Sequence, residues 1–181
     1  NSFVFINRIN LEIHEISKGK FFEDSEFYLE GFPVVHHKIP SNAYIFVKKG
    51  KLKIDKKKLK ESGLLSGPLL QKLKQGKDIL YNGKKYKSKD LTFLENSKKI
   101  SFLLDTKYHK DIEKFVKNSD LLISEASFDS SLAEKASESY HLTAKQAGEI
   151  AKKSKSKKLF LTHISQRYEK NLGKILKEAK K

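Results

Sequence analysis

An ionisable side chain follows each of three short apolar runs, at the point where a buried strand is expected to end. These side chains are Asp105, Glu125 and His163. Each one alone is an ordinary turn or cap residue. At equivalent edges of successive strands, however, we expect them to converge, because sites in layered α/β proteins collect at that rim.

Three further histidines extend this set. His141 stands where a helix is expected to start, and His36 and His37 lie in an early loop. Two imidazoles with a shared carboxylate suit zinc or another divalent metal, and two metals suit phosphodiester hydrolysis. The chain has no Cys, so any metal must be held by His, Asp or Glu.

The residues after His163 add a hydroxyl, a fixed cation and a phenol, namely Ser165, Arg167 and Tyr168. Arginine clamps phosphate with two parallel hydrogen bonds. The segment is therefore either a phosphate clamp or a polar turn after a strand.

Alternating strands and helices are expected to position these groups from residue 99 onward. The expected strands are 100–104, 121–123 and 158–162, and the expected helices are 110–118, 130–139, 143–154 and 170–180. Thr143 and Gln146 form a capping box at one helix start. Nearer the beginning of the chain, short strands are expected at 3–6, 11–16, 21–35 (one or two strands) and 43–47.

Residues 48–90 differ from the rest in charge. They contain fifteen Lys against four acids, a net of +11 out of +16 for the whole chain. Two short helices are expected there, one after Asp55 and one opening at Gly67-Pro68, followed by a hairpin at Asn82-Gly83. The segment is either a solvated insertion or a basic arm that grips a phosphate backbone, and its charge density favours the arm.

The totals point to a polyanionic partner. The 181 residues carry 38 Lys and Arg against 22 acids, which makes nucleic acid the first candidate and an acidic membrane surface the second. We find no long apolar span and no signal peptide, so the cytoplasm is the expected location. The absence of Met leads us to expect part of a longer or processed protein.

Several motifs together resemble the C-terminal part of ribonuclease Z, the tRNA 3′-processing endonuclease of the metallo-β-lactamase superfamily. In chain order they are HKIP, GPLLQKLKQG, LLDT, SEASF, YHLT and LTHISQRY. The resemblance covers essentially the whole chain. It implies an α/β fold, the C-terminal portion of an αββα sandwich with an inserted basic arm at 48–90 that binds tRNA.

The resemblance also implies roles for individual residues. His37 (with His36 the weaker choice), Asp105 and His163 match ligands of a site for two Zn²⁺ ions. His141 matches the proton donor to the leaving 3′ oxygen, and Glu125 matches the residue that orients it. Five residues match substrate contacts: Ser165, Arg167, Lys107, Gly67 and Pro68.

This sequence departs from the family pattern at three places. The family's His-Glu-Ala-Thr stands as SEAS, its His-Ser-Thr as HLT, and its Asp-Thr-Arg as DTK, which keeps the charge of Lys107 but loses the arginine fork. The family's first metal motif, His-x-His-x-Asp-His, does not occur in the chain. We therefore expect a missing N-terminal half, on the same or a separate chain.

Three functions remain in competition. The first is precursor-tRNA 3′ cleavage that needs the missing half, in an enzyme that the resemblance implies is a homodimer. The second is a non-catalytic basic tRNA-binding module. The third is another metallo-β-lactamase-fold nuclease or hydrolase, which the GPLLQKLKQG and LTHISQRY motifs disfavour.

Overall fold

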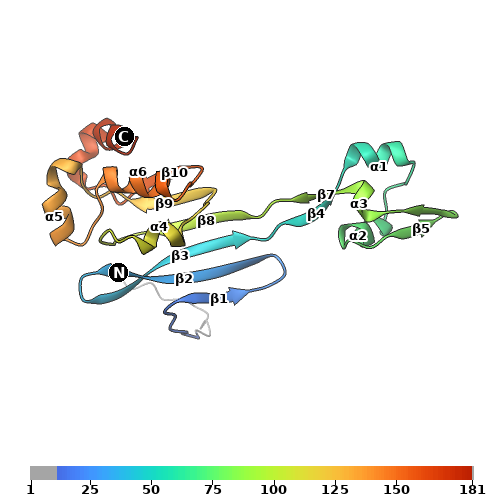
Figure 1. Ribbon diagram of the computed structural model, residues 1–181, viewed down its shortest axis with the longest axis horizontal. Helices are drawn as coiled ribbons and strands as arrows, with labels where there is room; N and C mark the ends of the chain where they lie inside the picture. The colour runs from blue at the N-terminus through green and yellow to red at the C-terminus, as the bar shows by residue number, and fades with distance from the viewer. Residues whose placement is uncertain (1–11, 181) are drawn as a thin grey trace, which may run out of the picture.

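Six strands form the central sheet of the computed structural model, which describes residues 12–180. In spatial order they are β1 (Gly19–Glu23), β2 (Phe27–His36), β3 (Ile39–Lys48), β8 (Lys98–Leu103), β9 (Leu121–Glu125) and β10 (Leu159–Thr162). Strands β1, β2, β3 and β8 run antiparallel to one another, whereas β8, β9 and β10 are parallel (Figure 1).

The strand predictions at the beginning of the chain need one correction. The predicted strand at 3–6 lies outside the described residues, and the prediction at 11–16 is wrong for residues 12–16, which form no strand. Instead Ile16 lies against Gly31, with its Cδ1 3.3 Å from where a Cβ on that glycine would stand. The Ile16 carbonyl accepts a hydrogen bond from Asn42 Nδ2 at 3.1 Å. The segment therefore lies against the sheet instead of adding a strand to it.

The three parallel strands end at one edge of the sheet. Their register pairs Leu103 with Ser124 and Ser124 with Leu161. Asp105 follows β8, Glu125 ends β9, and His163 follows β10, so the predicted side chains share one edge because the carboxyl ends of parallel strands coincide.

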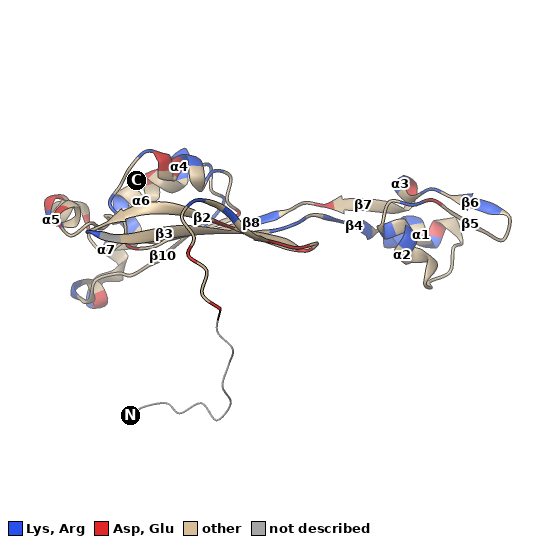
Figure 2. Cartoon of the chain, turned by 90° about the horizontal axis from the view of Figure 1, so that it is seen from below, with Lys and Arg blue, Asp and Glu red and all other residues tan. Residues whose placement is uncertain are grey.

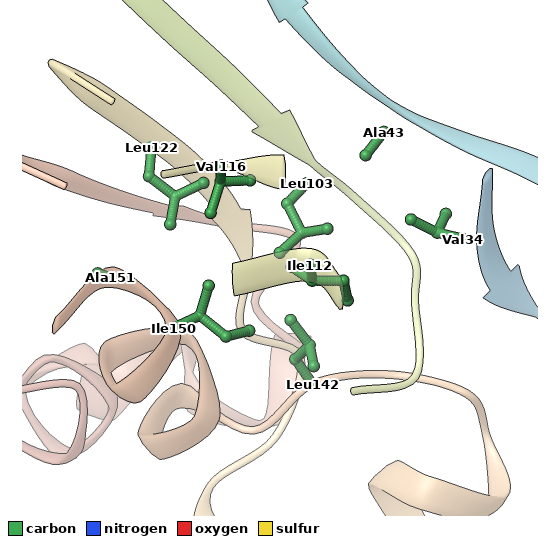
Figure 3. Close-up of a cluster of buried hydrophobic side chains, with 9 residues drawn as sticks. All are labelled: Val34, Ala43, Leu103, Ile112, Val116, Leu122, Leu142, Ile150 and Ala151. Atoms are coloured by element: carbon green, nitrogen blue, oxygen red, sulfur yellow. The ribbon is translucent and has the colours of Figure 1, made fainter. Parts of the chain in front are cut away.

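The main core lies between the sheet and two helices, α4 (Asp111–Phe115) and α6 (Ala144–Lys153). Figure 3 shows this cluster of nine buried residues: Val34, Ala43, Leu103, Ile112, Val116, Leu122, Leu142, Ile150 and Ala151. The Thr143–Gln146 capping box predicted from sequence is present at the start of α6. This core anchors both β9 and α6, the elements that flank His141 and Glu125.

The other helices are shorter than the sequence pattern predicted. The helix expected at 110–118 is the five-residue α4, and the one expected at 130–139 is a 3-10 turn, η1 (Ser130–Leu132), followed by α5 (Ala133–Glu138). The predicted terminal helix is also split, into η2 (Gln166–Asn171) and α7 (Leu172–Glu178). Among residues 12–180, no helix has the length and apolarity that a membrane crossing requires.

The opposite face of the sheet carries a row of apolar side chains. Tyr44, Phe102, Ile123 and Phe160 are consecutive partners across β3, β8, β9 and β10. Tyr44 is 40% exposed and Phe160 is 59% exposed. The sheet thus buries one face under helices and leaves large apolar groups accessible on the other.

A long projection leaves the sheet between β3 and β8 (Figure 1). Its stalk is the antiparallel pair β4 (Lys51–Ile54) and β7 (Thr92–Glu95). Its head comprises α1 (Lys56–Ser62), α2 (Leu69–Lys74), β5 (Ile79–Tyr81), β6 (Lys84–Tyr86) and α3 (Ser88–Leu91). We call residues Lys51–Glu95 the arm.

The arm has a small core of its own, formed by Leu64, Leu73, Ile79 and Leu91. Local predictions made from the sequence hold here: the Asp55 side chain accepts hydrogen bonds at the start of α1, and β5 and β6 pair around Asn82-Gly83. Figure 2 shows Lys and Arg along both the stalk and the head.

The arm and the strand edge that carries Asp105 lie at opposite ends of the sheet. β3 begins at Ile39, which pairs with His36, and ends at Lys48 beside the arm. Ten residues of strand, at about 3.3 Å each, separate the two ends by roughly 30 Å.

Candidate active site

Four of the predicted residues converge at the carboxyl edge of the parallel strands. Asp105, Glu125, His141 and His163 each offer one ligand atom, and these four atoms lie within 4.8 Å of one another. They come from segments that are up to 58 residues apart in sequence (105 to 163). The register of the sheet brings Asp105, Glu125 and His163 together, and the segment before α6 adds His141.

Glu125 is the buried centre of the group, with a side chain that is 0% exposed. Its Oε1 accepts a hydrogen bond from the Thr106 backbone N–H at 2.7 Å, and its Oε2 accepts one from the Ser127 hydroxyl at 2.6 Å. Oε2 also lies 2.9 Å from Nδ1 of His141. A buried carboxylate needs such partners, because burial without them carries a large free-energy penalty.

The second contact pair joins Asp105 to His163. Oδ1 of Asp105 lies 2.8 Å from Nδ1 of His163, and these side chains are 45% and 51% exposed. Both residues have positive φ angles, 27° for Asp105 and 51° for His163. Non-glycine residues rarely adopt this conformation, and strain of this kind clusters at functional sites.

Ser127 joins the two pairs, and the sequence analysis did not select it. Its hydroxyl lies 3.2 Å from His163 Nδ1 and 2.9 Å from the His163 carbonyl, in addition to its hydrogen bond with Glu125. The available signal was its position two residues after Glu125, because residues i and i+2 of an extended segment project on the same side.

The two early histidines lie beside this group but do not belong to it. The ring centroid of His36 is 5.1 Å from that of His141, and His36 Nδ1 lies 3.3 Å from the Tyr140 carbonyl oxygen. The ring of His37 instead lies 4.7 Å from that of Tyr140. The assignment of His37 as a metal ligand, with His36 as the weaker choice, stays a prediction.

Phe128 lies beside both Arg167 and His141. The guanidinium carbon of Arg167 is 5.1 Å from the Phe128 ring centroid, and that ring is 6.2 Å from the His141 ring. Arg167 Nε donates a hydrogen bond to Ser165 Oγ at 3.0 Å. Phe128 also forms an isolated parallel bridge with Thr143. Arg167 and Ser165 therefore lie at the same edge of the sheet as His141, and their role as phosphate contacts stays a prediction.

The remaining predicted contact residues are dispersed. Lys107 is exposed, with its ammonium nitrogen 5.6 Å from the Tyr140 ring centroid. Gly67 and Pro68 precede α2 in the arm, at the far end of the sheet. Their roles as substrate contacts stay predictions.

An ion pair between the buried Asp129 and the half-exposed Lys174 ties the end of the chain to this edge. Lys174 Nζ lies 2.5 Å from Asp129 Oδ2, and the Tyr168 hydroxyl accepts a hydrogen bond from the Asp129 backbone N–H at 3.0 Å. Burial acts to raise the pKa of Asp129, but hydrogen bonds from Lys174, Ser131 and Tyr168 outweigh it and hold the pKa well below its ordinary value. Asp129 is therefore charged at neutral pH.

The donor set fits a divalent metal such as zinc. Carboxylate oxygen and imidazole nitrogen are both zinc ligands, and the site brings two of each within 4.8 Å of one another. Three of the four side chains retain some exposure, so an ion from solvent has access. The described residues offer this one group of His, Asp or Glu suited to an ion.

The chain is similar in sequence to curated proteins named ribonuclease Z. No family model matches the chain. The chain is 34% identical over 175 residues to ribonuclease Z of Nanoarchaeum equitans, covering 97% of this chain and 55% of the relative. It is 38% identical over 176 residues to ribonuclease Z of Lactococcus lactis subsp. cremoris, covering 95% and 56%. The chain thus spans about half the length of these curated relatives.

Solved structures agree on the fold. The short form of human tRNase Z is 26% identical, with a TM-score of 0.51, over 83% of this chain and 41% of that chain. YhfI of Bacillus subtilis, a metallo-β-lactamase fold protein, is 18% identical, with a TM-score of 0.54, over 88% of this chain and 44% of that chain. The second similarity concerns the fold alone.

Proposed function

We propose that this chain, a homologue of part of ribonuclease Z with the metallo-β-lactamase fold, supplies one part of a tRNA-processing endoribonuclease. The reaction would be hydrolysis of one phosphodiester bond, which removes the 3′ trailer from precursor tRNA and leaves a 3′-hydroxyl. The observation that carries the proposal is the convergence of Asp105, Glu125, His141 and His163 within 4.8 Å.

His141 and Glu125 are assigned to proton transfer. The carboxylate of Glu125 faces Nδ1 of His141 at 2.9 Å, which leaves Nε2 as the imidazole nitrogen that donates a proton to the leaving 3′ oxygen. The buried carboxylate orients the ring and stabilises its protonated form, as an acidic residue does beside a catalytic histidine. The leaving oxygen then departs as a hydroxyl.

Asp105, His163 and His37 are assigned to the metal site. Two Zn²⁺ ions, once bound, would supply Lewis acidity that activates a water molecule and neutralises charge on the phosphate. Asp105 would contribute a carboxylate and each histidine one nitrogen to these ions. The remaining ligands would come from the segment that the longer relatives have and this chain lacks.

Arg167 and the arm are assigned to RNA binding. Arg167, held by Ser165 and Phe128, is placed to bind a phosphate near the cleaved bond, and Lys107 to bind another. The +11 net charge of residues 48–90 supports binding of the tRNA backbone by the arm, with Gly67-Pro68 at the start of one arm helix. The roughly 30 Å between arm and site suits an extended substrate.

Association with other chains is part of the proposal. The half-exposed row from Tyr44 to Phe160 supports docking of the missing N-terminal part, because a large apolar sheet face needs a cover. We propose that the complete enzyme is a homodimer in the cytoplasm.

The test is cleavage of a 3′-extended precursor tRNA in the presence of zinc. The 181-residue chain would be assayed alone and after mixing with the N-terminal part of a ribonuclease Z relative. We expect little cleavage by the chain alone and cleavage at the trailer junction by the mixture. Absence of cleavage by a mixture that forms a stable complex would contradict the proposal.

The basic charge of the arm also favours a second candidate, a tRNA-binding module without catalysis. That module would bind precursor tRNA with steep salt dependence, yet its complex with the N-terminal part would not cleave. A third outcome, faster cleavage of linear RNA than of folded tRNA, would indicate another nuclease of this fold.

A further inference from the structure

We propose that Ser127 is a positioning residue that fixes both Glu125 and His163 through its side-chain hydroxyl. This inference rests on the proposed function for its catalytic consequence, but its structural claim stands on the contacts of Ser127 alone. The Ser127 side chain is buried, with 5% of the residue exposed. Its hydroxyl is therefore largely shielded from bulk water and makes its hydrogen bonds to protein groups.

The hydroxyl of Ser127 lies between the two contact pairs of the site. It is 2.6 Å from Glu125 Oε2 and 3.2 Å from His163 Nδ1. Those atoms in turn are 2.9 Å from His141 Nδ1 and 2.8 Å from Asp105 Oδ1. One hydrogen-bonded chain therefore runs from Asp105 to His141, and Ser127 is its middle member.

The hydroxyl of Ser127 faces two groups that can only accept a hydrogen bond, the Glu125 carboxylate at 2.6 Å and the His163 carbonyl at 2.9 Å. A hydroxyl has one proton to donate and two lone pairs to accept with. The contact with the carboxylate is the shorter one and is made to a charged acceptor when Glu125 is ionised, so it takes that proton. A lone pair of Ser127 then faces Nδ1 of His163 at 3.2 Å, beside the closer Asp105 Oδ1 at 2.8 Å.

The same hydrogen bond limits the rotation of the Glu125 carboxylate. The Thr106 N–H holds Oε1 at 2.7 Å while Ser127 holds Oε2. With both oxygens held, Oε2 stays directed at Nδ1 of His141, and the His141 proton resides on Nδ1 in the neutral ring. Removal of the Ser127 hydroxyl leaves Oε1 held by one donor and Oε2 without its shortest contact.

Packing and hydrogen bonding make opposite predictions for two substitutions of Ser127. Ser127→Ala keeps the Cβ and removes the hydroxyl, whereas Ser127→Thr adds a methyl group and keeps the hydroxyl. A packing role makes Thr the worse variant, and a hydroxyl role makes Ala the worse one.

The first experiment measures histidine tautomers in the metal-free 181-residue chain by two-bond proton–nitrogen NMR correlation. We expect wild type and Ser127→Thr to hold His141 as the Nδ1–H tautomer, and Ser127→Ala to give mixed tautomers at His141, because the Glu125 carboxylate that faces His141 Nδ1 loses its Ser127 hydrogen bond. Ser124→Ala is the matched control, because Ser124 is also buried and its hydroxyl contacts only the Glu125 backbone carbonyl among the hydrogen bonds described. Unchanged tautomers in folded Ser127→Ala would overturn the proposal.

The second experiment measures cleavage of precursor tRNA by the complex of the chain with the N-terminal part. We expect Ser127→Ala to lower kcat about 10- to 100-fold, the usual cost of losing an outer hydrogen bond at a metal site, with KM unchanged. Ser127→Thr is expected to restore kcat. A wild-type complex that does not cleave contradicts the proposed function, whereas a cleaving wild type with an equally fast Ser127→Ala contradicts only the positioning role.

Discussion

Glu125 Oε2 lies 2.9 Å from His141 Nδ1, and the side chain of Glu125 is wholly inaccessible to solvent. The two residues are sixteen positions apart in sequence. The segment between them returns to the end of β9, where Phe128 forms a parallel bridge with Thr143. The buried carboxylate is held by its hydrogen bonds, and it controls the orientation of a ring that retains access to solvent.

Replacement of His141 by Ala tests the proton donor. We expect cleavage by the complex with the N-terminal part to fall by about 10²- to 10⁴-fold, the range for loss of a general acid, while RNA affinity is retained. Both quantities come from single-turnover kinetics and filter binding. His14→Ala, in the exposed segment before the sheet, is the control and should cleave as the wild type does. Equal loss of binding and cleavage in His141→Ala would argue against the assignment.

Replacement of Asp105 by Asn tests the metal site. The amide keeps the shape of the side chain but removes the charge and one acceptor, so zinc affinity should fall by more than the ~10–100-fold typical of an outer hydrogen-bond partner. Isothermal titration with Zn²⁺ measures the affinity. Asp111→Asn, which changes an exposed residue of α4, should bind zinc as the wild type does. Equal affinities in the two variants would place the ion elsewhere.

Removal of the arm tests its role in RNA binding. Lys48 and Lys98 are partners at the end of the antiparallel pair β3–β8, so a two-residue turn can replace residues 49–97. We expect weaker tRNA binding. We also expect the logarithm of the association constant to fall less steeply with the logarithm of the salt concentration, because fewer counterions are released. Circular dichroism checks that the sheet is retained. An unchanged slope would mean that the arm does not contact phosphates.

Replacement of Gly148 by Ala tests the packing of α6 on the end of α7. A Cβ at Gly148 would lie 2.2 Å from the Ala179 carbonyl oxygen. The substitution normally stabilises a helix by about 0.5–1 kcal/mol, but here we expect destabilisation of about 1–3 kcal/mol from overpacking. Gly173→Ala in α7 has open space, with its nearest neighbour 3.8 Å away, and should stabilise. Urea unfolding of both variants measures the difference, and stabilisation by both would contradict it.

The ion pair of Asp129 with Lys174 predicts a pH dependence of stability. The folded pKa of Asp129 is depressed below its unfolded value of about 3.9 by hydrogen bonds that outweigh burial. Its contribution is therefore fully present at neutral pH and is lost as pH falls below about 4 toward the folded pKa. Asp129→Asn should lower the free energy of unfolding at pH 7. It should also reduce the loss of that free energy between pH 7 and pH 3, which is the acid limb of the stability curve. Urea unfolding from pH 3 to 7 measures both.

The control for this prediction is Asp90→Asn, an exposed residue of the arm. It should change neither the stability at pH 7 nor the shape of the acid limb. An acid limb as steep in Asp129→Asn as in the wild type would show that other carboxyl groups cause it.

Local sequence determined which segments form strands and helices and which residues stand at their ends. The runs before Asp105, Glu125 and His163 are apolar because those strands are buried, and the capping box at Thr143 depends on residues only three apart. The same local rules failed for residues 12–16. An alternating run becomes a strand only if it pairs with a neighbouring strand, and this one lies against Gly31 instead.

Tertiary structure decided how the chemical groups meet. Ser127 was recognised only when its hydroxyl was placed between Glu125 and His163, because its position two residues after Glu125 does not show which other groups it contacts. The placing of His36 near His141, the stacking of Arg167 on Phe128, and the position of the arm at the opposite end of β3 likewise depend on strand order and register. These are properties of long-range pairing, which residue spacing along the chain does not encode.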